Sequence, residues 1–214
     1  MNAEPGLRER KKEQRRQRIA DTARRLFAER GFEGVTVAEV AREANVSEGT
    51  VFNYFPTKED LFYSGMESFE AALIEAVRNR PPGQSVLAAF RDYVLEQSDG
   101  VADRAPAIDK AARLVDASPA LQARERAVVA EYTAALAELL AAETGAASGD
   151  IEPRVVAAAL MAAQRELVAQ TRASVAAGLG GPALVRSVKA QGMRAFARLE
   201  AGLGDYGVKS APGR

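Results

Sequence analysis

The sequence predicts an all-α protein: an N-terminal three-helix helix-turn-helix unit plus a larger helical domain, about nine helices in total. Three observations support this. Ala, Leu, Glu and Arg, which all favour helices, dominate the 214 residues. No stretch shows the apolar–polar alternation of a strand. Capping residues, glycines and prolines divide the chain into segments of helical length.

The first expected helix covers residues 14–30. Ile19, Ala23 and Leu26 have the spacing of one apolar stripe, and Gly31 is a typical helix stop. Residues 1–13 are expected to be a flexible basic arm before this helix.

Two short helices follow. Thr36 and Glu39 have the spacing of a capping box and predict a second helix that ends near residue 44. Asn45 suits the turn because Asn tolerates the left-handed conformation. Ser47 is expected to cap a third helix that ends near Tyr54. Two helices joined in this way form a helix-turn-helix.

The rest of the chain reads as longer helices. Pro56 interrupts the chain, and Thr57 with Asp60 forms a second capping box that begins a helix to about residue 80. Further helices are expected at 84–98, 104–116, 119–143, 151–178 and 183–203. The expected domain limits are therefore 14–57 for the three-helix unit, 58–204 for a larger helical domain, and 205–214 for a flexible tail.

Composition narrows the class of function. The chain has no Cys and no His, so thiol chemistry, His general-base catalysis and ordinary zinc sites are excluded, and we expect no enzyme, no catalytic residue, no metal and no cofactor. The longest apolar run, residues 155–163, is shorter than the roughly 20 residues of a membrane span. A cytoplasmic protein without a membrane partner is expected.

Charge is balanced overall, with 29 basic and 29 acidic residues, but not locally. Seven Lys or Arg residues lie between Arg8 and Arg18, against Glu9 and Glu13. They could form a solvated arm, or they could contact the DNA backbone or minor groove beside the helix-turn-helix.

Residues 34–62, GVTVAEVAREANVSEGTVFNYFPTKEDLF, resemble the DNA-binding signature of the TetR family of transcriptional regulators. The preceding Leu26-Phe27-x-x-x-Gly31-Phe32 ending belongs to the same pattern. The resemblance covers about residues 14–65. It implies an all-helical homodimer that binds double-stranded operator DNA and responds to a small-molecule effector of unknown identity. By the resemblance, residues 14–57 are the DNA-binding domain and residues 58–204 are the effector-binding and dimerisation domain.

The third helix is the expected DNA reader. Val40, Ala41 and Val51 have core spacing, which leaves the opposite side of the helix free to enter a major groove. By the resemblance, the residues at base-reading positions are Glu48, Gly49, Phe52 and Asn53. A glycine inside a helix costs up to about 1 kcal/mol. Close approach to DNA would explain Gly49, and so would crowding between helices.

Hydroxyl and ammonium groups around the motif suit phosphate oxygens. By the resemblance, Thr36, Thr50, Tyr54 and Lys58 fall at phosphate-contact positions, and the Ser47 hydroxyl suits the same role. Thr36 and Ser47 also have capping duties, so a purely structural role is the alternative for them. Two departures from the family pattern are Asn45, where Gly is common, and Phe52, where Tyr is common.

The larger domain carries broad apolar faces that are either plain core or the lining of an effector cavity. Phe90, Tyr93, Arg113, Gln164 and Arg165 are the candidate effector-binding residues. The last two long helices are candidates for a dimer interface, because one has many small residues and the other has an apolar stripe at Leu184, Val188, Phe196 and Leu199.

The favoured interpretation is a repressor released from a palindromic operator by a small apolar effector. The main alternative is a helix-turn-helix module that binds DNA or a protein without any effector. An enzyme or carrier with a structural three-helix unit is a third possibility, but no nucleophile–base pair, phosphate loop or metal cluster supports it.

Overall fold

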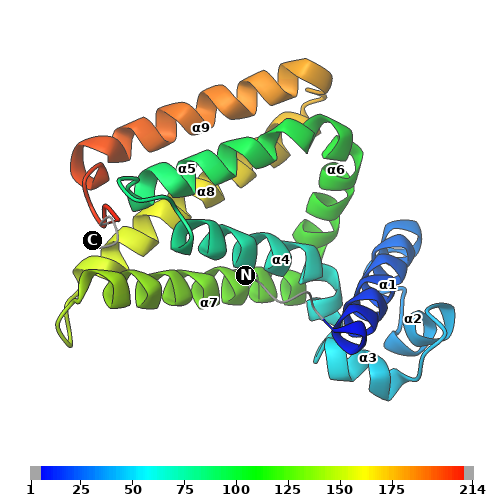
Figure 1. Ribbon diagram of the computed structural model, residues 1–214. Helices are drawn as coiled ribbons and strands as arrows, with labels where there is room; N and C mark the ends of the chain where they lie inside the picture. Colours follow the sequence, from blue (N-terminus) through cyan, green and yellow to red (C-terminus); the bar gives the residue numbers. More distant parts are fainter. Residues whose placement is uncertain (1–5, 210–214) are drawn as a thin grey trace. The chain divides into compact units, whose positions relative to one another are not determined.

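The structure is a computed structural model that describes residues 6–209, and over that range it contains nine α-helices and one short 3₁₀ helix (Figure 1). The all-α prediction is confirmed. The helices are α1 (Leu7–Arg30), α2 (Val37–Glu43), α3 (Glu48–Tyr54), α4 (Lys58–Arg78), α5 (Val86–Gln97), η1 (Ser98–Gly100), α6 (Val101–Ala117), α7 (Pro119–Thr144), α8 (Glu152–Ala176) and α9 (Gly181–Leu203).

The chain divides into two compact units. The smaller unit comprises residues up to Glu67 together with Arg113–Glu125, and the larger unit comprises Ser68–Ala112 together with the residues from Arg126 onward. The division falls inside α4, α6 and α7, so these three helices contribute residues to both units. The domain limits expected from the sequence stay a prediction.

The smaller unit is built on aromatic packing between α1, the loop after it and the start of α4. The Phe27 ring centroid lies 5.2 Å from that of Phe32 and 6.2 Å from that of Phe62. Phe55, at the end of α3, is only 1% exposed. This core fixes α2 and α3 against α1.

Helix α1 begins at Leu7, seven residues before the predicted start at Gln14. The Arg10 amide donates to the Gly6 carbonyl at 3.0 Å, which is the first hydrogen bond of the helix. Arg, Lys, Glu and Gln have high helix propensity, so a charged segment continues a helix as readily as an apolar one. Residues 7–13 of the predicted arm are therefore helical, and residues 1–5 lie outside the described range.

In the larger unit, α9 packs along α8 and α5 (Figure 1). The rings of Phe90 and Phe196 meet edge-on at 5.9 Å. A side chain at Gly192 would come within 2.6 Å of the Leu95 side chain and 3.2 Å of the Leu167 side chain. The glycine thus lets α9 approach its neighbours closely.

The apolar stripe of α9 faces the core of its own chain. Leu184 and Phe196 are fully buried, and Val188 is nearly so. The expectation that this stripe forms a dimer seam is wrong for these three residues, because helical periodicity marks a buried face without saying which element covers it.

The C-terminal segment after α9 is attached to the loop between α4 and α5. The Gly83 amide donates to the Lys209 carbonyl at 2.8 Å, and the Lys209 amide donates to the Gln84 carbonyl at 3.3 Å. The Arg80 guanidinium donates to the Gly207 carbonyl at 2.6 Å. Residues 205–209 of the predicted flexible tail are held in place, and residues 210–214 lie outside the described range.

Within residues 6–209, no helix combines the length and the apolar character that a membrane crossing requires.

Candidate nucleic-acid interface

Helices α2 and α3 form the predicted helix-turn-helix. The Thr36 hydroxyl accepts from the Glu39 amide at 3.2 Å while the Glu39 carboxylate accepts from the Thr36 amide at 2.8 Å, which confirms the first capping box. Asn45 has φ 53°, the left-handed conformation expected at the turn. Ser47 caps α3 by accepting from the Thr50 amide at 3.1 Å.

Helix α3 buries one side and exposes the other. Val51 is fully buried, whereas Glu48, Gly49 and Asn53 are exposed. Phe52 keeps 46% of its surface exposed, which is unusual for a large apolar side chain. The four residues predicted to read bases therefore lie on the side of α3 that the chain itself does not cover.

The space around Gly49 decides between the two explanations for this residue. A Cβ atom built at Gly49 would meet only the Ser47 Oγ, at 4.0 Å. No neighbouring helix would be displaced, so crowding between helices does not explain the glycine. The exposed side of α3 therefore has free space beside Gly49.

The hydroxyls of the motif are partly engaged. Ser47 Oγ and Thr50 Oγ1 lie 2.8 Å apart and share one hydrogen bond, so the pair keeps one hydroxyl proton for an outside acceptor. The Thr36 hydroxyl donates to Glu39 at 3.0 Å. Hydrogen bonds from the Thr36 backbone, Arg30 and the Thr36 hydroxyl lower the pKa of Glu39 to about 2. A phosphate contact by Thr36 would have to replace its bond to this carboxylate.

Lys58 lies in the first turn of α4, with its Nζ 4.2 Å from the centre of the Phe32 ring. The helix is capped reciprocally by Thr57 and Asp60, whose amides donate to each other's side chains at 2.8 and 3.1 Å. The second capping box is thus confirmed. A cation at a helix N-terminus is unfavourable by itself, and a bound anion there would offset this.

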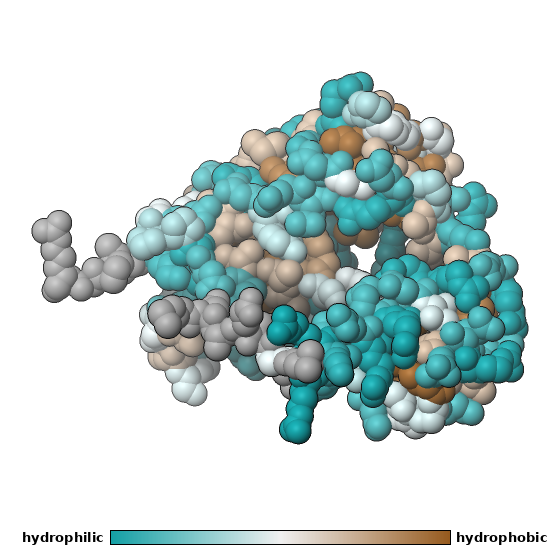
Figure 2. Space-filling model, turned by 45° about the vertical axis from the view of Figure 1, so that its right-hand side comes forward, coloured by the Kyte–Doolittle hydropathy of each residue, from teal (hydrophilic) through white to brown (hydrophobic). Residues whose placement is uncertain are grey.

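The N-terminal part of α1 and the end of α3 form a groove in the smaller unit. Its lining includes the cationic side chains of Arg10, Lys12 and Arg16 and the acid Glu13. The neutral polar side chains in the lining are those of Gln14, Gln17, Asn53 and Tyr54. Because α1 extends back to Leu7, part of the basic run is helical and lies beside the end of α3. Hydrophilic residues predominate on the face of the molecule shown in Figure 2.

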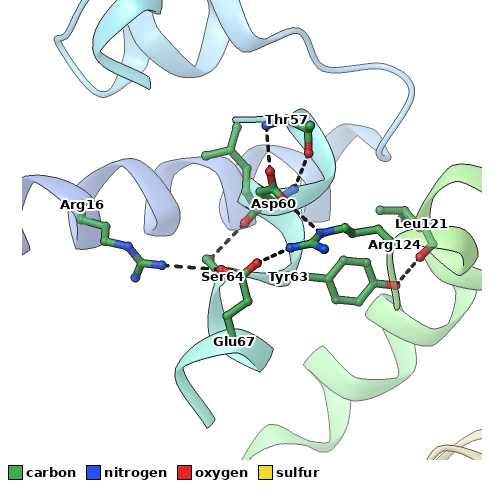
Figure 3. A network of polar contacts seen from close by, with 9 residues as sticks. Arg16, Thr57, Asp60, Tyr63, Ser64, Glu67, Leu121 and Arg124 are labelled. Atoms are coloured by element: carbon green, nitrogen blue, oxygen red, sulfur yellow. Dashed lines mark hydrogen bonds and ion pairs between the residues drawn. The ribbon is translucent and has the colours of Figure 1, made fainter. Parts of the chain in front are cut away.

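Three helices of the smaller unit meet in a network of ionic contacts (Figure 3). Arg124 of α7 donates to Asp60 at 2.7 Å and to Glu67 at 2.9 Å, both on α4. Arg16 of α1 lies 3.7 Å from Glu67, and the Tyr63 hydroxyl donates to the Leu121 carbonyl at 2.9 Å. The start of α4 is thereby held to both α1 and α7.

The predicted effector residues differ in their surroundings. Phe90 is fully buried against Phe196, and Gln164 is 6% exposed on α8. Tyr93 is half-buried, and its ring lies 5.5 Å from that of Phe69. Arg165 is exposed, because neighbouring residues on a helix point in different directions. Arg113 belongs to the smaller unit, not to the larger one.

The sequence analysis missed two features. Arg124 was not singled out because its acidic partners are 64 and 57 residues away, and such pairings leave no local pattern. Glu70 was also missed, although a signal existed. It lies three residues before Leu73 and seven before Val77, on the apolar stripe of α4.

Fold and site define a helix-turn-helix DNA-binding protein. The family described as "Bacterial regulatory proteins, tetR family" matches residues 19–64, and the family described as "MftR C-terminal domain" matches residues 84–203. No group of three or more carboxylates that could hold a metal ion is present in the described part of the chain.

Known proteins with similar sequences are transcriptional regulators of the helix-turn-helix type. The HTH-type transcriptional regulator TcmR of Streptomyces glaucescens is 31% identical over 173 residues, 75% of this chain and 74% of TcmR. The HTH-type transcriptional repressor KstR of Rhodococcus jostii is 33% identical over 113 residues, 51% of this chain and 52% of KstR. Among solved structures, the SmeT–triclosan complex aligns over 94% of this chain and 99% of SmeT, with a TM-score of 0.56 and 16% identity.

The chain belongs to the TetR family of bacterial transcriptional regulators. The predicted class, a DNA-binding transcriptional regulator, is confirmed.

Proposed function

We propose that this regulator is a repressor that binds a near-palindromic operator as a homodimer and leaves it when a small, largely apolar effector binds the larger unit. It acts by binding, without catalysis, and in the cytoplasm where its operator lies. The observation that carries the proposal is the exposed face of α3, where Phe52 keeps 46% of its surface exposed and Gly49 has open space beside it.

The proposed division of labour follows from side-chain chemistry. Glu48, Gly49, Phe52 and Asn53 lie at base edges, where Asn53 pairs with a base and Phe52 contacts a thymine methyl. Thr36, Ser47, Thr50, Tyr54 and Lys58 contact phosphates, which position the protein without reading sequence. The cationic groove between α1 and α3 adds further backbone contacts.

Dimerisation is required because α3 has only seven residues, and one such helix reads few base pairs. A twofold dimer doubles the site and explains a palindromic operator. The proposed seam uses the exposed residues of α8 and α9. Val155, Val168 and Met193 are 56%, 37% and 51% exposed, and Ala158, Ala162, Ala190 and Ala197 continue these stripes at helical spacing.

Effector release is proposed from the continuity of α4. This helix begins with Lys58 in the smaller unit and continues to Arg78 in the larger unit. A ligand that moves α4 would change the spacing of the two recognition helices, which must match about 34–36 Å on DNA. Reversing a 99:1 preference for DNA requires about 5.5 kcal/mol, shared between two sites. KstR is named a repressor, and the SmeT structure contains a small molecule, which supports both parts of the proposal.

Operator binding by paired variants tests the proposal. Fluorescence anisotropy of labelled operator variants should show that Lys58→Ala weakens binding evenly, whereas Asn53→Ala relaxes the preference at particular base pairs. An equal effect of both variants on every sequence would contradict the division of labour. Operator binding that no apolar compound weakens would favour a helix-turn-helix module without an effector.

A further inference from the structure

Glu70 is a carboxylate in the interior of the larger unit. Its side chain is 1% exposed, and both carboxylate oxygens are buried without a hydrogen-bond partner among the described residues. Buried polar groups in folded proteins nearly always have partners, and each exception requires an explanation.

Arg80, another buried charged residue of the same unit, has hydrogen-bond and ion-pair partners within the chain. Arg80 is 3% exposed and donates to the carbonyls of Val77 and Gly207 at 2.7 and 2.6 Å. It also pairs with Glu143 at 2.7 Å. Arg80 is thus satisfied within the chain. Glu70, by contrast, has no such hydrogen-bond or ion-pair partner among the described residues.

Protonation alone does not resolve the position of Glu70. Burial raises the pKa of this carboxyl to about 7, so the neutral form becomes accessible. A neutral carboxyl still has one donor and one acceptor, and both would remain unpaired here. An unpaired buried donor or acceptor is unfavourable, because it has lost its hydrogen bonds to water and gained none. A partner from outside the chain would remove this cost.

The surroundings of Glu70 indicate what that partner is. Phe69 is its neighbour on α4, and the Phe69 ring lies 5.5 Å from the ring of Tyr93 on α5. Burial raises the pKa of Tyr93, and the negative charge of Glu70 raises it further. Leu73 and Ile74, one turn further along α4, are buried and apolar. Glu70 therefore shares the buried apolar side of α4 with Leu73 and Ile74, and the Phe69–Tyr93 ring pair lies beside it along the chain.

We propose that Glu70 is the anchor of the effector site and that the effector is an apolar molecule carrying a protonated amine. The ammonium group donates to both carboxylate oxygens, as charge-assisted hydrogen bonds that are shorter and stronger than neutral ones. The half-buried side chains of Phe69 and Tyr93 move to admit the apolar part of the effector, and their rings then make cation–π contacts with the ammonium group. This inference rests on the proposed function, whose effector it assigns to a chemical class.

A ligand series of constant shape tests the inference. The probes are 2-phenylethylammonium, 2-phenylethanol and propylbenzene, which carry a charged donor, a neutral donor and no donor on one skeleton. Calorimetric titrations at pH 8, where Glu70 is ionised, compare the wild type with Glu70→Gln. The wild type should bind the ammonium compound about tenfold more tightly than the alcohol, and Glu70→Gln should abolish that preference. Glu138→Gln, an exposed substitution on α7 with the same change of charge, should keep it.

Equal binding of the three probes by the wild type, absence of ammonium binding, or an ammonium preference that survives in Glu70→Gln would overturn the inference. Labelled operator in the same titrations separates this failure from failure of the proposed function. Release of operator by the neutral probes without any amine preference would leave the repressor proposal standing. Glu70-dependent amine binding that leaves operator affinity unchanged would instead contradict effector release.

Discussion

Two glycines, one in each unit, differ in what surrounds them. Gly192 in α9 has side chains of Leu95 and Leu167 where its own side chain would be, so the packing of its chain explains it. Gly49 in α3 has open space there, although a residue with a side chain would favour the helix. The packing of its own chain accounts for Gly192 but not for Gly49, and the proposed close approach of α3 to DNA would account for Gly49.

Replacing one phenylalanine in each unit should give the largest difference in stability between the two units. Phe196 is fully buried against Phe90, so Phe196→Ala should lower the free energy of unfolding by about 3–5 kcal/mol. Phe52 is 46% exposed, and Phe52→Ala should change stability by at most about 0.5 kcal/mol. Urea unfolding measures both. Operator affinity should fall about tenfold for Phe52→Ala. A large stability loss at Phe52 would break the comparison.

The pH dependence of the free energy of unfolding tests whether burial raises the pKa of Glu70. Below pH 4.5, Glu70 is protonated in both the folded and the unfolded state. Between 4.5 and about 7 only the folded chain keeps the proton, so the free energy of unfolding falls as pH rises, by about 3 kcal/mol in total. Glu70→Gln should remove this decrease, measured by urea unfolding at pH 5 and pH 8. Glu138→Gln should retain it. A wild-type profile that is flat over this window would show that Glu70 is solvated or paired.

Equal substitutions at the two glycines sharpen the comparison further. Leu is a good helix former, so Gly→Leu changes helix propensity alike at both positions and leaves packing as the difference. Gly192→Leu should lower stability by about 1–3 kcal/mol, because the new side chain overlaps those of Leu95 and Leu167. Gly49→Leu should leave the thermal midpoint unchanged or raise it. Equal destabilisation at both positions would contradict the open space beside Gly49.

The groove beside α3 predicts a small electrostatic effect. Lys12 lines the groove, and its neighbour Lys11 does not. Lys12→Ala should flatten the plot of log affinity against log salt by about one unit, since one phosphate contact is lost. Lys11→Ala should leave the slope unchanged. If the two variants behave alike, the basic run acts only as a diffuse positive charge.

The sequence predicted what depends on near neighbours. Both capping boxes, the left-handed Asn45 and the limits of every α-helix except the start of α1 were predictable within a few residues, because caps and turns involve residues three or four apart. Contacts between distant segments were not. The α9 stripe was assigned to a partner because periodicity does not identify the covering element, and Arg124 gave no local sign of its two acidic partners.

The start of α1 shows a related limit. Apolar spacing placed it at Gln14, and the charged residues before that were expected to be flexible, although their helix propensity is high. The exposed face of α3 was easier to predict, because Val51 and its core neighbours determine which residues point outward.

Operator binding by Gly49→Leu, measured beside its thermal midpoint, tests the central claim most directly. If α3 reads DNA through the open side of Gly49, a side chain there holds the helix away from the groove. Operator affinity should then fall at least about tenfold while the midpoint stays the same or rises. Unchanged operator affinity in this stable variant would contradict the account, because the exposed face of α3 would then not be the surface that meets DNA.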